Sequence, residues 1–138
     1  MFKKMVVGFL FDRNRRCVLL IKKNRPDWQK GYLNGVGGHV EPGEDMFEAM
    51  KREFLEEVGV ETDGWKHTVR WLGKDWLVDF FYLIDGEAFE RATTMTDEEI
   101  VRVGIEKWNG SWLLPNLRWM IPFQLEDEIQ FPVTLQGL

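Results

Sequence analysis

Residues that cross-link a chain or anchor it in a membrane are scarce in this sequence. Its 138 residues include one cysteine, Cys17, so neither a disulfide framework nor a thiolate metal cluster is expected. The apolar run from Met5 to Phe11 is far shorter than the ~20 residues that span a bilayer. The charged stretch from Asp12 to Arg16 follows directly, without the small residues that end a signal peptide. We therefore predict no membrane association and a reducing, cytoplasmic location.

Positive charge is also limited. The chain has 18 Lys and Arg residues against 23 Asp and Glu residues, a net charge of −5. Proteins that bind duplex nucleic acid usually present a basic face to the phosphates, so a duplex partner is not expected. An anionic substrate would need a divalent cation between itself and so acidic a protein.

What the chain does have is the composition of an ordinary globular protein. Hydrophobic residues make up 44% of it and charged residues 30%, close to the usual proportions. The length suits one domain, which we place over residues 1–138.

The pattern of apolar residues predicts strands around two helices. Short apolar segments predict five strands, over residues 4–11, 17–21, 65–72, 76–84 and 100–108. The first and second strands are expected to form one hairpin, and the third and fourth another. Residues 31–40 hold four glycines, too many for a normal strand interior. Helices are predicted over 45–58 and 116–126, with a helical turn within the loop 85–99. Strands with a central and a late helix indicate an α/β or α+β sandwich.

The central helix has clear boundaries and a clear apolar face. Asp45 and Glu48 form the spacing of a capping box, and Gly59 suits the left-handed residue that ends a helix. Four apolar side chains recur at helical spacing and are expected to hold the helix against the sheet: Phe47, Met50, Phe54 and Val58.

A second face of this helix carries three carboxylates. Glu53, Glu56 and Glu57 are spaced i, i+3 and i+4, so they project from the same side. Such a group favours a hard cation such as Mg²⁺ or Mn²⁺, although a solvated acidic face is the alternative. Arg52 lies four residues before Glu56, close enough to pair with it. Gly37 and the neighbouring glycines before the helix keep side chains away, so a phosphate or a metal could approach the backbone there.

Residues 38–60 match the Nudix box, Gly-x5-Glu-x7-Arg-Glu-U-x-Glu-Glu-x-Gly-U with U apolar, at every position. The matching residues are Gly38, Glu44, Arg52, Glu53, Phe54, Glu56, Glu57, Gly59 and Val60. The sequence thus resembles the Nudix hydrolases over 23 of its 138 residues. The resemblance implies an α/β/α sandwich with a mixed sheet, in which the box forms a loop–helix–loop.

The resemblance also implies an activity, a cofactor and residue roles. Nudix hydrolases cleave a diphosphate bond in a nucleoside diphosphate linked to another group. By resemblance, one or more Mg²⁺ (or Mn²⁺) ions would be held by these groups: the backbone carbonyl of Gly38 and the carboxylates of Glu53, Glu56 and Glu57. Arg52 and Glu44 would orient them. The general base would be either Glu53 or a carboxylate in a later loop, and the candidates there are Asp97, Glu98 and Glu99. Glu98 is also a candidate metal ligand.

The substrate is less constrained. The marks of NADH, ADP-ribose and coenzyme A hydrolases are missing, so hydrolysis of nucleoside triphosphates to a monophosphate and pyrophosphate is the leading hypothesis. Residues 33–38 resemble the Trp-Asn-Gly-Phe-Gly-Gly stretch of hydrolases of oxidised purine nucleotides, such as 8-oxo-dGTP. That likeness makes Asn34 the first candidate for base recognition, with Gly37 and Gly38 beside the substrate. Asn116 stands about where those enzymes carry an aspartate pair, which weakens the case for oxidised purines.

Aromatic residues offer stacking surfaces for a base. Most of the seven tryptophans are expected to be core residues, while Trp28 and Trp112 are singled out as candidates to stack on the nucleotide. Two alternatives stay open: another substrate such as a dinucleoside polyphosphate, or a module that senses a nucleotide without cleaving it. The intact box favours catalysis. A homodimer is also left open.

Overall fold

The computed structural model describes residues 2–106 and 112–138. Eight strands form one mixed sheet in the described part of the chain: β1 (Lys3–Phe11), β2 (Cys17–Lys22), β3 (Leu33–Asn34), β4 (Val36–His39), β5 (Lys66–Leu72), β6 (Trp76–Ile84), β7 (Ile100–Gly104) and β8 (Val133–Gln136). Their main order is β3-β2-β1-β6-β5-β8, with β4 paired to β1 and β7 paired to β2. The β1–β6 and β5–β8 pairs are parallel and the others antiparallel.

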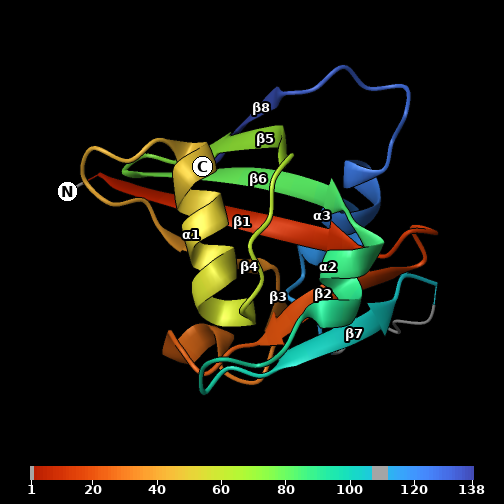
Figure 1. Ribbon diagram of the computed structural model, residues 1–138. Coiled ribbons are helices and arrows are strands. Elements are labelled where there is room, and N and C mark those ends of the chain that lie inside the picture. The colour runs from red at the N-terminus through yellow and green to blue at the C-terminus, as the bar shows by residue number, and fades with distance from the viewer. Residues whose placement is uncertain (1, 107–111) are drawn as a thin grey trace.

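Helices cover both faces of this sheet (Figure 1). Helix α1 (Met46–Val58) and the short α2 (Gly86–Arg91) pack on one face, and α3 (Leu117–Gln124) packs on the other. A 3₁₀ turn, η1 (Asp27–Gln29), lies in the loop after β2. The predicted α/β/α sandwich is therefore confirmed, with one core on each side of the sheet.

Helix α1 forms as its sequence predicts. The Asp45 carboxylate accepts a hydrogen bond from the Glu48 N–H at 2.9 Å, and Glu48 returns one to the Asp45 N–H at 3.1 Å. Gly59 ends the helix with a φ of 79°. Met50, Phe54 and Val58 are fully buried, as expected.

Phe47 is the exception to the predicted apolar stripe. It is 43% exposed, although its ring meets Phe81 of β6 edge-on. Ala49 takes the inward position in this first part of the helix and is fully buried. Phe47 therefore contacts the sheet, as predicted, but it is not buried between the helix and the sheet.

The glycine-rich segment also differs from its prediction, because it contains β3 and β4. β4 pairs with β1 along Met5–Gly8. A Cβ on Gly37 would lie 1.9 Å from the Val6 carbonyl oxygen, so the strand depends on glycine at that point. Glycine inside a strand here marks a close approach of two backbones rather than the absence of a strand.

The later elements follow the predictions with one omission. β5 and β6 form the predicted hairpin, and α3 begins one residue after the predicted start. β8 was not predicted; it has few apolar residues and is held mainly by its pairing with β5. Residues 107 and 108 of the strand predicted over 100–108 lie outside the described part, which shows β7 over Ile100–Gly104.

The tryptophans depart most from expectation. Of the six that the structure describes, only Trp65 is buried. Trp28 is 69% exposed and Trp112 is 66% exposed, so both remain available to a ligand. Trp108 lies outside the described residues. No helix within the described ranges is long and apolar enough to cross a membrane.

Candidate active site

Arg52 organises the acidic residues at the start and middle of α1. Its guanidinium donates two hydrogen bonds to Glu44, at 2.7 and 3.0 Å, and one to Glu53 at 2.9 Å. It also reaches the His39 carbonyl at 2.9 Å and forms an ion pair with Glu56 at 3.3 Å. The predicted Arg52–Glu56 pair is confirmed. Because Arg52 bridges the loop before the helix, β4 and the helix, it fixes how the carboxylates are oriented.

These contacts shift the pKa values of the partners in the expected directions. The hydrogen bonds from Arg52 lower the pKa of Glu44, although partial burial opposes them. Hydrogen bonding to Glu44 is also the main cause that raises the pKa of Arg52. The guanidinium therefore remains charged, and Glu44 is ionised beside it.

Glu53 lies directly against the glycine-rich strand. A Cβ on Gly38 would lie 2.5 Å from the Glu53 carboxyl carbon, so only glycine allows this approach. The Glu53 side chain is 13% exposed, and burial raises its pKa despite the opposing effect of Arg52. The Glu53 carboxylate thus lies against the backbone of Gly38, and both are residues that the sequence analysis proposed as metal ligands.

Glu57 carries an unsatisfied buried oxygen. Burial raises its pKa to about 7, with further contributions from the negative charges of Glu53 and Glu98, while Lys23 and the Gly37 backbone act in the opposite direction. Within the described residues, its Oε2 is the buried side-chain oxygen or nitrogen that has no hydrogen-bond partner. A buried polar atom without a partner needs an explanation, and a bound cation would supply one.

The carboxylates do not by themselves form a finished metal site. In the described part of the chain, no three His, Cys, Asp or Glu side chains are grouped so that they could hold a metal ion. Glu56 is 55% exposed and stays on the outer side of the cluster, next to Arg52. Mg²⁺ commonly uses one or two carboxylates and completes its shell with water and substrate phosphate. Glu53, Glu57 and the Gly38 carbonyl fit that pattern, with Glu56 at the edge.

Of the three carboxylates proposed in the later loop, Glu98 is the one that is buried and whose charge acts on the box residue Glu57. It is only 3% exposed. Its Oε1 accepts a hydrogen bond from the Lys23 ammonium at 3.1 Å, and its Oε2 accepts one from the Asn24 N–H at 2.7 Å. Asp97 is exposed and pairs with Arg25, and Glu99 is also exposed. Sequence spacing offered no signal for Lys23 as a member of this cluster.

The residues predicted to bind the base gather around β3. Asn34 donates a hydrogen bond to Gln29 at 3.2 Å, and its carbonyl oxygen accepts one from the Gly35 N–H at 2.7 Å. Gln29 directly follows Trp28 in η1, so the partner of Asn34 belongs to the same turn as this exposed tryptophan. The Trp112 carbonyl accepts a hydrogen bond from the Leu33 N–H at 2.7 Å. The structure thus brings Asn34, Trp28 and Trp112 to one region.

Two other residues qualify this picture. Asn116 precedes α3 at its N-terminus, where its side chain makes no capping hydrogen bond. Gln29 was missed by the sequence analysis, because nothing in its local sequence indicates that it contacts Asn34. The two hydrogen bonds of Asn34 show that it also shapes the glycine-rich segment.

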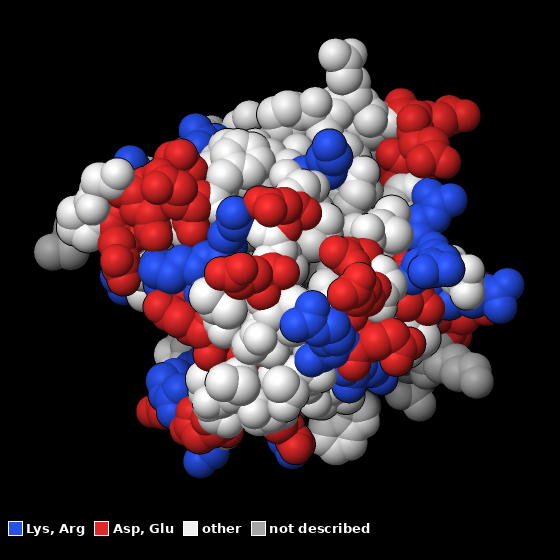
Figure 2. Space-filling model, in the orientation of Figure 1, with Lys and Arg blue, Asp and Glu red and all other residues white. Residues whose placement is uncertain are grey.

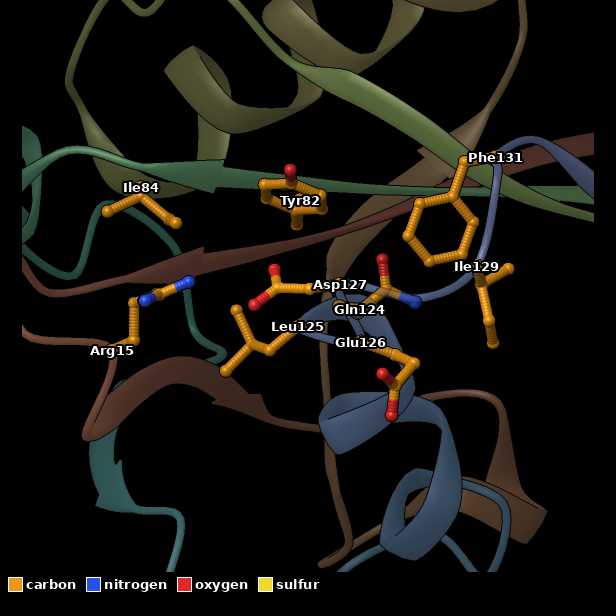
Figure 3. A pocket seen from close by; sticks show the side chains of 9 residues that line it. All are labelled: Arg15, Tyr82, Ile84, Gln124, Leu125, Glu126, Asp127, Ile129 and Phe131. Carbon is orange, nitrogen blue, oxygen red and sulfur yellow. The ribbon is translucent and has the colours of Figure 1, made fainter.

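A separate cavity lies on the α3 side of the sheet (Figure 3). It has a volume of about 180 Å³ and is lined by side chains that include Arg15, Tyr82, Gln124 and Asp127. Figure 3 shows the Arg15 guanidinium pointing toward the Asp127 carboxylate. None of its lining residues belongs to the 38–60 segment, so this cavity is distinct from the carboxylate cluster.

The α1 face itself carries charges of both signs. Figure 2 shows Asp and Glu side chains interspersed with Lys and Arg, without a continuous basic area on this face. The cluster of Arg52 with its acidic partners belongs to this charged surface. An anionic ligand would meet acidic side chains here unless a cation came between them.

Comparison with known families agrees with the complete Nudix box in this sequence. Residues 1–121 match the family model of the NUDIX domain. The chain belongs to the Nudix family. Nudix hydrolases act on phosphoric anhydrides and generally use divalent metals such as Mg²⁺, and the donors found at Glu53, Glu57 and Gly38 suit such an ion.

Solved structures show the same Nudix fold. One, from a study of MutT of Aliivibrio salmonicida and Vibrio cholerae, has a TM-score of 0.74 and 22% identity over 91% of this chain and 98% of its own. A MutT protein from Bacillus halodurans has a TM-score of 0.71 and 16% identity, covering 98% and 90%. A Nudix hydrolase from Nitrosomonas europaea has a TM-score of 0.75 and 14% identity, covering 98% and 79%. A search of curated proteins finds no match.

Proposed function

We propose that this Nudix protein is a Mg²⁺- or Mn²⁺-dependent hydrolase of nucleoside triphosphates, which releases a nucleoside monophosphate and pyrophosphate. The observation that carries the proposal is the unpartnered, buried Oε2 of Glu57, near the backbone of Gly37 and the charge of Glu53, which itself lies against Gly38. Without a cation this arrangement places two carboxylates together in a partly buried position, which is unfavourable. The likeness of residues 33–38 to a stretch of the hydrolases of oxidised purine nucleotides makes nucleoside triphosphates the first substrates to test.

The proposed reaction needs residues that bind the cation and residues that orient these ligands. When bound at Glu53, Glu56, Glu57 and the Gly38 carbonyl, the divalent cation would neutralise phosphate charge and lower the pKa of the attacking water. Arg52 keeps Glu44, Glu53 and Glu56 oriented through its hydrogen bonds and ion pair. The orientation of these carboxylates is thereby set before the substrate arrives.

Glu53 is our proposed general base. Its hydrogen bond from Arg52 goes to Oε1, and burial raises its pKa toward the range in which a carboxylate accepts a proton effectively. Glu98, the alternative, has Oε1 engaged by Lys23 and Oε2 engaged by the N–H groups of Asn24 and Arg25. A carboxylate that already accepts three hydrogen bonds is less able to take a proton from water.

The nucleoside would bind near β3. Asn34 offers both a donor and an acceptor to a base edge, and Trp28 and Trp112 are exposed enough to stack on it. Gly37 and Gly38 leave room for phosphates at the start of the box, and Asn116 lies at the N-terminus of α3. An asparagine in that last position makes no specific case for oxidised purines, so both ordinary and oxidised nucleotides belong in the test.

The decisive experiment is a panel of nucleotides with the purified protein. Ordinary and 8-oxo nucleoside triphosphates and dinucleoside polyphosphates are incubated with Mg²⁺, Mn²⁺ or EDTA, and chromatography separates phosphate, pyrophosphate and monophosphate. We expect pyrophosphate and a monophosphate, dependent on the cation and lost in Glu57→Gln. Release of phosphate from triphosphates, or cleavage of dinucleoside polyphosphates alone, would assign another Nudix substrate. Nucleotide binding without turnover of any compound would indicate a sensing module.

A further inference from the structure

Lys23 lies where the nucleotide loop meets the carboxylate cluster. Its N–H donates to the Tyr32 carbonyl at 2.9 Å, and its carbonyl accepts from the Gly31 N–H at 2.8 Å. These two hydrogen bonds close the loop that contains Trp28. The Lys23 side chain is only 16% exposed, in contrast to the exposed Lys22 before it. A mostly buried ammonium requires compensation by negative charge.

Glu98 provides the first part of that compensation. The Lys23 ammonium lies 3.1 Å from Glu98 Oε1. The second oxygen, Oε2, accepts hydrogen bonds from the Asn24 and Arg25 N–H groups at 2.7 and 3.3 Å. Both oxygens of Glu98 are thus held by consecutive residues of one loop. Glu98 therefore joins the segment before β7 to the loop after β2.

Glu57 provides the second part. Lys23 is the cation whose charge acts on Glu57, while Glu53 and Glu98 act on it with the opposite sign. Glu57 has an oxygen with no hydrogen-bond partner among the described residues. The ammonium is therefore ion-paired with Glu98 of the segment before β7, and it acts on Glu57 of α1 only through space. Lys23 lies outside the box, and no spacing rule in the sequence connects it to these residues.

We propose that Lys23 is a positioning residue that acts as the internal counter-ion of Glu98, the candidate metal ligand of the later loop, and competes with a divalent cation for it. The proposal rests on the proposed function, because it needs a cation at the carboxylates. A fixed positive charge already paired with a carboxylate repels a second cation, and this repulsion is weakly screened where water is scarce. The same charge keeps that carboxylate ordered when no divalent cation is bound.

The test measures cation affinity rather than turnover. Mn²⁺ binding to the full chain without nucleotide is followed by electron paramagnetic resonance and by calorimetry at one fixed pH. Lys23→Met keeps the length of the side chain and removes the charge, and we expect it to tighten Mn²⁺ binding by about tenfold. Lys23→Arg keeps the charge and should leave the affinity within about twofold of the wild type. Lys22→Met, at the exposed neighbour, is the matched control and should change nothing.

The possible results separate this inference from the proposed function. Unchanged or weaker Mn²⁺ binding in a folded Lys23→Met protein would overturn the role of Lys23 and leave the hydrolase proposal intact. If the wild type did not bind Mn²⁺ at all, the proposed function would fail first. Circular dichroism checks folding. If Lys23→Met does not fold because Glu98 is left unpaired, the double variant Lys23→Met/Glu98→Gln is compared with Glu98→Gln, and tighter binding in the double variant is again required.

Discussion

The two faces of the sheet differ in how their side chains are used. On the α1 face, one helix with defined caps buries Met50 and Phe54 and presents its carboxylates to Arg52. On the α3 face, the core is rich in aromatic rings, and Trp71 and Trp119 pack together with Trp119 still 44% exposed. The first face combines a rigid helix with charge, whereas the second offers partly open aromatic surface and a cavity.

The residues proposed for chemistry and those proposed for base recognition also come from different parts of the chain. The box residues are spaced along one helix, so their relative positions are fixed by the helix itself. The candidate base-binding residues Trp28, Asn34 and Trp112 come from three separate segments and meet only through hydrogen bonds around β3. We expect substitutions in the first group to affect all substrates equally, and those in the second group to change the choice of substrate.

The largest expected effect is on the α1 face. Glu57→Gln preserves the shape of the side chain and removes a charged cation ligand, so turnover should fall by at least ~10²–10⁴ for every nucleotide. Chelation by EDTA should abolish turnover in the wild type and leave the circular-dichroism spectrum nearly unchanged, because apolar contacts hold α1. Full activity in EDTA or in Glu57→Gln would contradict the role of the cluster, and loss of secondary structure with EDTA would show that the fold depends on metal.

The next effect concerns stability and separates the buried stripe of α1 from its exposed border. Phe54 is fully buried and packs against Trp65, so Phe54→Ala should lower the free energy of unfolding by about 3–5 kcal/mol. Phe47→Ala, at the exposed border, should cost less than about 1 kcal/mol. Urea denaturation measures both. Equal losses would mean that the helix is held evenly along its length rather than by its inner stripe.

A pH effect should follow from Glu57. Its pKa of about 7 in the folded protein lies above that of the unfolded chain, so the folded state holds the proton more tightly. The resulting stability is fully present below about pH 4.5 and is lost as the pH rises to about 7. In EDTA, Glu57→Gln should therefore be more stable than the wild type at pH 8 by about 2 kcal/mol, and the difference should vanish near pH 4.5. If the stability difference between Glu57→Gln and the wild type were the same at pH 4.5 and pH 8, it would come from packing rather than from the charge of Glu57.

A smaller effect is expected from the base-binding region. Asn34→Ala should change the ranking of nucleotides, mostly through KM and by about tenfold for the preferred base, while the metal requirement stays. Trp112→Ala should weaken binding of all bases by a similar factor, because stacking is tolerant of base identity. If Asn34→Ala lowered kcat equally for all nucleotides, its hydrogen bonds to Gln29 and Gly35 would be its main contribution.

The smallest effect should come from the cavity on the α3 face. Asp127→Asn and Arg15→Met alter charges that line it and lie outside the box, so kcat and KM should stay within about twofold of the wild type. Steady-state kinetics with the best nucleotide measures this. A loss of tenfold or more in either variant would show that the α3 face communicates with the carboxylate cluster, and the division between the two faces would no longer hold.

The sequence alone determined the parts of the protein that are local. Helix α1, its capping box and its Gly59 end follow from residues within a few positions of each other. The order of the box residues also follows, because helical spacing places Arg52 near Glu56 whatever surrounds them. The β1–β2 and β5–β6 hairpins were predicted for the same reason, since each depends on neighbouring segments.

Only the tertiary structure decided what depends on contacts between distant segments. β4 forms despite two glycines because β1 lies against it, and β8 forms because β5 is available to pair with it. Phe47 stays 43% exposed although it contacts Phe81 of β6, and Lys23 meets Glu98 because two loops 75 residues apart in sequence are packed together. Spacing along the chain contains no information on such contacts, whose geometry is set by the packing of the whole sheet and its helices.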